Sequence, residues 1–213
     1  CYVNFCAALE MALRQGKMKK YGDEQLGLPT ADPRTCQTWE EFFDLYKQQH
    51  TLFLRACFTQ QLIVNKTRPR HFAAPMLSAM HDLCMKHNMD LHSEHIPEGA
   101  EFGYYEFMGL GTVIDSLAAV KKLVFEEKRI TMAELMEAID ANWVGYEAIQ
   151  QMVKSCPCYG NDDEYVDSIG KELDLMCVKF TRKYNKELGM NNDVRYVPFT
   201  SHVPFGKVVS ATP

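Results

Sequence analysis

The segment from residue 98 to residue 107 is rich in aromatic residues and contains no proline. It also contains three carboxylates, Glu98, Glu101 and Glu106. The residues from Glu101 to Phe107 predict a short buried strand, in which alternation puts Glu101 and Gly103 on one face. Burying a carboxylate among aromatic side chains costs free energy, so Glu101 needs either a cationic partner or a chemical role. The sequence leaves both readings open.

Histidines and cysteines crowd the region from residue 81 to residue 95, namely His81, Cys84, His87, His92 and His95. Imidazole and thiolate are good zinc ligands. However, His81 and Cys84 lie one turn apart on a helical face that is otherwise apolar, while His92 and His95 fall in a predicted loop. Nothing in this spacing defines a tetrahedral site, and we expect no metal here.

Three other patterns favour structural roles. Cys156 and Cys158 are separated by one residue, whereas zinc and redox pairs usually have two between them. Residues 162–164 are acidic, as expected at the start of a helix because of its dipole. The segment 109–111 (Gly-Leu-Gly) lacks the third glycine and the lysine of a phosphate loop, and it predicts a bend into a helix.

Composition excludes several classes of protein. The chain has 213 residues and a net charge of -5, and its local basic clusters are offset by acids, which argues against a nucleic-acid binder. No apolar run approaches the ~18–20 residues that a membrane span needs. Cysteines such as Cys6, Cys57, Cys84 and Cys177 sit in apolar helical patterns, so we interpret them as reduced, buried thiols of an intracellular protein.

The elements that must position these residues are mostly helices. Two capping boxes, Thr38 with Glu41 and Thr131 with Glu134, mark helix starts. The first helix shows no N-cap, which suggests that the chain is cut from a longer one. The predicted helices are Val3 to Arg14, Thr38 to about Asn65, Pro75 to about His87, Thr112 to Glu127, Thr131 to Asn142, Val144 to Lys154 and Asp162 to Leu188, and the predicted extended segments are Glu101 to Phe107, Val194 to Phe199 and Val203 to Val209.

Three stretches carry a family resemblance. They are Gly99-Ala-Glu-Phe-Gly with the later Asp115-Ser-Leu-Ala-Ala, the stretch Tyr159-Gly-Asn-Asp-Asp-Glu-Tyr-Val-Asp, and His202-Val-Pro-Phe-Gly-Lys-Val-Val-Ser-Ala-Thr-Pro. Together they resemble the glycyl radical enzymes, the pyruvate formate-lyase family. The similarity spans nearly the whole chain.

The resemblance implies an α/β fold, in which residues 1–213 form an internal, mostly helical part of a ten-stranded α/β barrel with a few short buried strands. The family's active cysteine would lie shortly before residue 1, and its radical-bearing glycine well after residue 213. We therefore expect this segment to bind no cofactor and to be inactive alone, while the longer parent protein is a lyase with a glycyl radical elsewhere in its chain.

Glu101 stands where many family members have arginine, and the run that follows it is unusually aromatic. This pattern is most similar to the branch that decarboxylates 4-hydroxyphenylacetate or a related arylacetate. The resemblance then implies that Glu101 is catalytic and accepts the phenolic proton, with Glu98 or Glu106 as alternatives. Substrate-binding roles are expected for Tyr104, His202, Val203 and Phe205.

The resemblance also implies partners. They are a radical S-adenosylmethionine activating enzyme, the remaining parts of the barrel, a second copy in a homodimer and a small iron–sulfur subunit, all in the cytoplasm of an anaerobe. Two alternatives stay open. One is another glycyl radical enzyme: a diol dehydratase, a choline lyase, an arylsuccinate synthase or a formate acetyltransferase. The other is a non-catalytic helical interaction protein.

Overall fold

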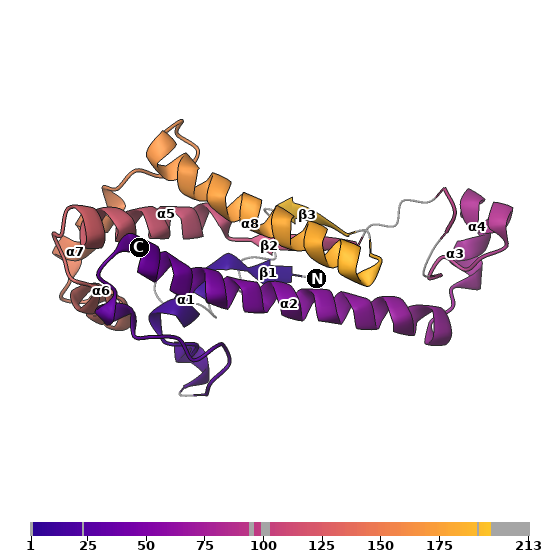
Figure 1. Cartoon of the computed structure of the whole chain (residues 1–213), viewed down its shortest axis with the longest axis horizontal. Coiled ribbons are helices and arrows are strands. Elements are labelled where there is room, and N and C mark those ends of the chain that lie inside the picture. Colours follow the sequence, from indigo (N-terminus) through magenta and orange to yellow (C-terminus); the bar gives the residue numbers. More distant parts are fainter. Residues whose placement is uncertain (1, 23, 94–95, 99–102, 191, 197–213) are drawn as a thin grey trace.

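The computed structural model describes residues 2–22, 24–93, 96–98, 103–190 and 192–196, with the backbone alone for residues 2 and 103–105. The fold is mostly helical with three short strands, as predicted (Figure 1). The elements are β1 Tyr2–Asn4, α1 Phe5–Leu13, η1 Lys19–Tyr21, η2 Pro33–Thr35, α2 Trp39–His71, α3 Pro75–Ala79, α4 Asp82–His87, β2 Gly103–Met108, α5 Leu110–Val120, the π-helical turn η3 Lys121–Glu126, α6 Met132–Asp140, α7 Glu147–Lys154, α8 Glu164–Leu188 and β3 Asn192–Tyr196.

The three strands form one sheet in the order β1-β2-β3, and both pairs are parallel. Parallel neighbours need long crossover connections, which are usually helical. Helices α1 to α4 connect β1 to β2, and α5 to α8 connect β2 to β3. Helices α2 and α8 run alongside the strands, while α3 and α4 lie apart from the body at the end of α2 (Figure 1).

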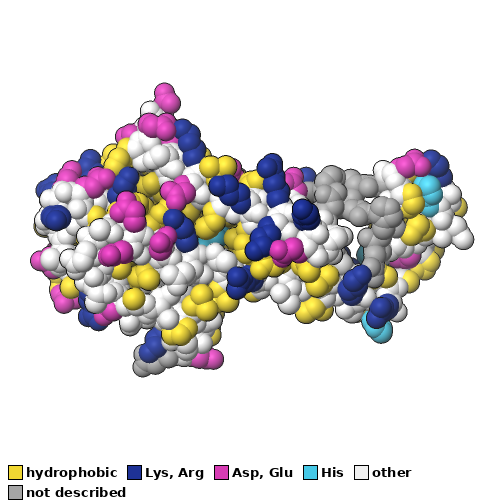
Figure 2. All heavy atoms as spheres, viewed as in Figure 1, with side chains coloured by type: hydrophobic (Ala, Val, Ile, Leu, Met, Phe, Trp, Pro, Cys, Tyr) yellow, Lys and Arg dark blue, Asp and Glu magenta, His cyan; other side chains and the backbone are white. Residues whose placement is uncertain are grey.

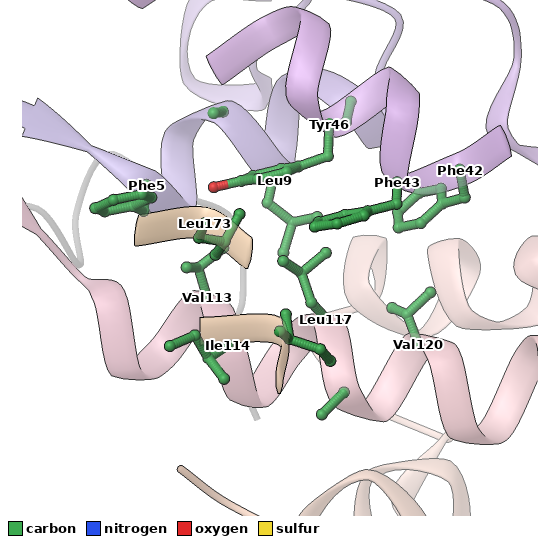
Figure 3. Close-up of a cluster of buried hydrophobic side chains, with 14 of the residues drawn as sticks. Phe5, Leu9, Phe42, Phe43, Tyr46, Val113, Ile114, Leu117, Val120 and Leu173 are labelled. Atoms are coloured by element: carbon green, nitrogen blue, oxygen red, sulfur yellow. The ribbon is translucent and has the colours of Figure 1, made fainter. Parts of the chain in front are cut away.

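The core lies where α1, α2, α5 and α8 meet against one face of the sheet. Figure 3 shows Leu9 of α1 and Tyr46 of α2 converging with Val113 and Leu117 of α5 and with Leu173 of α8. Most of these side chains are fully buried. The apolar side chains of these four helices thus form one shared core.

The start of the chain differs from the prediction. Val3 belongs to strand β1 and not to the first helix, which begins at Phe5. That helix does have an N-cap, because the Asn4 Oδ1 accepts hydrogen bonds from the backbone N–H groups of Cys6 (3.0 Å) and Ala7 (3.4 Å). The strand has three residues and depends on pairing with β2, so helical periodicity alone could not reveal it.

Helix α2 is longer than predicted. It was expected to end near Asn65, but it continues through Pro69 to His71 and closes with a hydrogen bond from Phe72 N to Arg68 O (2.9 Å). Proline removes a single backbone donor and disfavours the helical conformation of the residue before it. Placed in the last turn, Pro69 weakens the end of the helix without stopping it.

The predicted helix from Pro75 to His87 is two helices. The backbone of His81 is extended, with φ -115° and ψ 114°, and separates α3 from α4. The side chain of Asp90 attaches the loop after α4 to α3, because its carboxylate accepts hydrogen bonds from Ala74 N (2.8 Å) and from Ser78 Oγ (3.0 Å). A contact across twelve residues or more is not visible in local patterning.

Other boundaries shift by two or three residues. Helix α7 begins at Glu147 rather than Val144, because Gly145 adopts a positive φ of 83°, which a right-handed helix cannot contain. Helix α8 begins at Glu164, with Asp163 as its N-cap. Both predicted capping boxes are present. The predicted extended residues 197–199 and 203–209 lie outside the described part of the chain.

Surface charge follows the helix dipoles. Helix α8 carries Glu164 and Asp167 in its first turn and Lys186 in its last. Figure 2 shows basic side chains gathered over the C-terminal half of this helix. In the part of the chain that the structure describes, no helix has both the length and the apolar character of a membrane span.

Gly109 is the turn residue that the sheet requires, and it generates a stability prediction. Its φ is 75°, and an added Cβ would lie 3.0 Å from the Cys6 Sγ. We expect Gly109→Ala to lower the free energy of unfolding of the parent protein by about 1–2 kcal/mol, since an L side chain is strained in this region. Gly111→Ala is the matched control, because a Cβ there meets nothing within 4 Å. Equal unfolding free energies for the two variants would contradict this expectation.

Candidate functional site

The predicted site residues fall mostly outside the described residues. Glu101, His202, Val203 and Phe205 all do so, and their predicted roles stay predictions. For Tyr104 the structure gives the backbone, which lies in β2 and pairs in register with Asp193 of β3.

The topology places the described strands that follow Glu101 and precede residues 202–205. Glu101 precedes the first residue of β2, whereas residues 202–205 follow the last residue of β3. Because β2 and β3 are parallel, the chain enters β2 and leaves β3 at opposite ends of the sheet.

The two alternative carboxylates are placed differently. Glu98 is exposed and lies in a turn after α4, where it pairs with Lys86 Nζ at 2.8 Å and with His87 Nε2 at 3.4 Å. Glu106 lies within β2, in register with Arg195 of β3, and is half-buried. Among the described carboxylates considered in the sequence analysis, Glu106 is thus the one that lies on the sheet.

The two faces of the sheet have different chemistry. Phe107, Val194 and Tyr196 belong to the face that packs into the helical core. Alternation places Glu106 and Arg195 on the other face, and Arg195 is exposed. This face thus carries an arginine and a glutamate at paired positions of the two strands, residue types that can recognise an anion and accept a proton. The sequence analysis missed Arg195, although the alternation of polar and apolar residues from 192 to 196 could have revealed it.

Behind the sheet lies a buried chain of polar groups. The hydroxyl of Tyr46 is 3.4 Å from His50 Nδ1, and His50 Nε2 is 3.5 Å from Cys177 Sγ. At the far end, the Tyr196 hydroxyl donates to Asp174 Oδ1 at 2.7 Å. These side chains connect α2, α8 and β3. The predicted burial of Cys177 is confirmed, whereas His50 was not recognised because it looks like part of an ordinary helical face.

Burial keeps the side chains of His50, Cys177 and Tyr196 in their neutral forms. Burial lowers the pKa of His50 to about 3 and raises the pKa of the Cys177 thiol to about 12. The pKa of Tyr196 is raised strongly, first by burial and then by its hydrogen bond to Asp174. At neutral pH these groups therefore donate and accept hydrogen bonds without ionising, which suits a structural role better than acid–base catalysis.

The histidine-rich region does not converge in the described residues. Within them, no three His, Cys, Asp or Glu side chains are grouped so that they could hold a metal ion. His81 is exposed, and His92 Nδ1 lies against the carbonyl oxygen of Phe72. His95 lies outside the described residues.

The acidic and cysteine motifs have local partners. Asp163 caps α8 by accepting from Tyr165 N at 3.0 Å, and Glu164 pairs with Lys171 at 2.9 Å. The thiols of Cys156 and Cys158 each lie 3.5 Å from a backbone oxygen within the same turn. These contacts agree with the structural readings of both motifs.

Comparison with known proteins identifies the family. A family model described as pyruvate formate lyase-like matches residues 1–206. The chain belongs to this family, the glycyl radical enzymes that the sequence motifs resemble.

Three relatives show the range of similarity. An isethionate sulfite-lyase from Bilophila wadsworthia (strain 3_1_6) is 65% identical over 212 residues, which cover 100% of this chain and 26% of the relative. A trans-4-hydroxy-L-proline dehydratase from Clostridioides difficile is 33% identical, with coverage of 100% and 27%. The glycerol-bound B12-independent glycerol dehydratase from Clostridium butyricum superposes with a TM-score of 0.85 at 28% identity, with coverage of 100% and 26%.

These comparisons correct the sequence-based interpretation in one respect. The chain spans about a quarter of the length of the curated relatives it matches, as expected for a segment of a longer chain. The three relatives described above, however, are a sulfite-lyase and two dehydratases, and an indoleacetate decarboxylase is only 30% identical over 49% of this chain, so the specific prediction of an arylacetate decarboxylase is not supported.

The buried histidine generates a prediction about pH. The usual pKa of histidine is 6.5, and His50 in the folded protein is protonated only near pH 3. Between these values the unfolded chain binds a proton that the folded chain does not, so stability falls as the pH drops from about 6.5 towards 3, by at most ~1.4 kcal/mol per pH unit. His50→Phe, which retains an aromatic ring against Phe5, should reduce this slope in urea unfolding of the parent protein.

The control for this experiment is His81→Gln, because His81 is exposed and its loss should leave the slope unchanged. The comparison concerns the change of unfolding free energy with pH and not its absolute value, since His50→Phe also removes hydrogen-bond partners of Tyr46 and Cys177. A wild-type slope in His50→Phe would contradict the burial argument.

Proposed function

We propose that this chain is part of a glycyl radical lyase that releases sulfite from isethionate, 2-hydroxyethanesulfonate. The observation that carries the proposal is the 65% identity, across the whole of this chain, to an isethionate sulfite-lyase. In this reaction the carbon–sulfur bond breaks, the hydroxyl-bearing carbon becomes the carbonyl of acetaldehyde, and the other carbon gains a hydrogen atom. Sulfite leaves with the proton of the hydroxyl group, so the atoms balance without an external oxidant.

The exposed face of the sheet supports this choice of substrate. A sulfonate is an anion whose oxygens can accept several hydrogen bonds at once. Arginine is well suited to such a group, because its planar guanidinium presents a fork of donors and stays charged. Arg195 lies on the face of the sheet opposite to the helical core, and we propose that it binds the sulfonate.

The hydroxyl end of the substrate needs a different partner. Glu101 remains our proposed proton acceptor, with the alcohol of isethionate in place of a phenol, and Glu106 is the alternative that lies on the described sheet. Residues Tyr104, His202, Val203 and Phe205 remain proposed walls of the substrate pocket. A carboxylate and a guanidinium at the two ends would orient a small hydroxyalkylsulfonate.

The radical and the partners belong to the parent protein. We propose that a glycine outside this chain stores the radical and that a radical S-adenosylmethionine enzyme generates it, as the family resemblance implies. A homodimer and a cytoplasmic location in an anaerobe remain part of this proposal. The small iron–sulfur subunit was expected from the arylacetate branch, and the proposal does not include it.

The activity itself is tested with the parent protein, activated anaerobically and supplied with isethionate. We expect sulfite and acetaldehyde in equal amounts. A protein that gave neither product but dehydrated a diol or hydroxyproline would belong with the dehydratases that the chain also resembles.

Arg195 provides a residue-level prediction. We expect Arg195→Gln to raise the KM for isethionate by about 10- to 100-fold, because a hydrogen bond to a charged group contributes about 1.5–3 kcal/mol. The turnover number should change less, since binding of the sulfonate is common to the ground state and the transition state. Lys179→Gln, which removes an exposed cation of α8, is the control and should leave both constants unchanged. An unchanged KM in Arg195→Gln would remove the sulfonate role from this residue.

A further inference from the structure

Helix α8 holds strand β3 at both of its ends. At the start of the strand, the side chain of Asn185 makes two hydrogen bonds to the backbone of Asn192. Its Nδ2 donates to Asn192 O at 2.8 Å, and its Oδ1 accepts from Asn192 N at 3.1 Å. These bonds satisfy backbone groups at the first residue of β3 and attach it to the last turns of α8.

The other end of β3 is attached through Tyr196. Its hydroxyl donates to Asp174 Oδ1 at 2.7 Å. Its ring packs on Phe107, with centroids 5.8 Å apart, and on Phe5 at 6.3 Å. Tyr196, the last described residue of β3, is therefore held at its hydroxyl by a carboxylate and along its ring by the core.

The spacing of the two attachments matches the geometry of the elements. Asp174 and Asn185 are eleven residues apart, which is about three turns and ~16 Å of helix. The strand between Asn192 and Tyr196 spans about 13 Å. A rigid helix of α8's length can thus determine where both ends of the short strand lie.

Arg195 depends on this arrangement. It precedes Tyr196 directly, and alternation places the two residues on opposite faces of β3. Within the described residues, β3 forms backbone pairs with β2 only. The two residues share one stretch of backbone, so any rotation of Tyr196 about the strand axis would move Arg195 by a similar angle.

We propose that Asp174 and Tyr196 are positioning residues that aim Arg195 at the anionic group of the substrate. This inference rests on the proposed function, because it assumes that Arg195 binds a sulfonate. Neither residue touches the substrate. They act from the buried side of the sheet, through the hydrogen bond from the Tyr196 hydroxyl to Asp174 Oδ1.

A binding experiment separates this role from a general effect on stability. Isethionate is titrated into the full-length parent protein before activation, so that affinity is measured without turnover. Tyr196→Phe deletes the hydroxyl and keeps the ring, and we expect it to weaken binding about 5- to 10-fold, the value of one hydrogen bond whose loss misaligns a charged contact.

The chain offers a matched control. Tyr165 also donates from its hydroxyl to a carboxylate, Glu126, at 2.8 Å, but it does so on the surface near η3. Tyr165→Phe should therefore bind isethionate within twofold of the wild type. Asp174→Asn is the second variant, since its amide keeps an acceptor oxygen of the same shape, and it should weaken binding less than Tyr196→Phe.

A double-mutant cycle identifies the route of the effect. If Tyr196 acts through Arg195, then Tyr196→Phe should change affinity little in an Arg195→Gln background. An equal loss in both backgrounds would overturn the inference, as would wild-type affinity in Tyr196→Phe alone, and neither result would affect the proposed function. A wild-type protein that binds no isethionate would contradict the proposed function and, with it, this inference.

Discussion

The arrangement depends on the packing of helices against one face of the parallel sheet. Val3, Phe107 and Tyr196 stand in one row across the three strands. Phe5, at the start of α1, packs on Phe107. Its ring also stacks on the imidazole of His50 in α2, with ring centroids 4.6 Å apart. Removing these large side chains from water is the main favourable term in such a layer. With one face committed to the core, polar side chains of the strands must occupy the other.

Polar groups inside this layer make its geometry specific. A buried hydroxyl, imidazole or amide is costly unless it finds a partner, so each one restricts how its neighbours can pack. His50 has contacts to Tyr46 and Cys177, which tie α2 to α8. Gln49 is fully buried and exchanges hydrogen bonds with the backbone of Leu28, at 2.7 and 3.0 Å, which holds the long loop after α1 against α2.

The same layer also holds the short strand β3 in place. Strand β3 has five residues, and within the described sheet it pairs with one strand, β2. The contacts of Tyr196 with the core and of Asn185 with the strand's first residue give it the rigidity that pairing alone does not provide. A binding group on a rigid element keeps its orientation, which is the condition for recognising a small anion.

Local chemistry in the sequence determined much of the secondary structure. Thr38 and Thr131 begin helices because each reciprocal cap with a glutamate needs only residues within one turn. Gly109 ends β2 because glycine adopts the left-handed conformation without strain. Motifs such as His202-Val-Pro-Phe-Gly also pointed to the correct family, although the substrate branch inferred from Glu101 was not supported.

The tertiary structure decided what depends on distant residues. The three-residue strand β1 exists only because β2 pairs with it, so the periodicity around Val3 read as a helix. Pro69 remains helical because it falls in the last turn. Asp90 bonds back to Ala74 at the start of α3, a contact across sixteen residues that no local pattern reveals. Likewise, the place of Arg195 opposite Glu106 follows from a register between strands 89 residues apart, and only the folded chain brings those charges together.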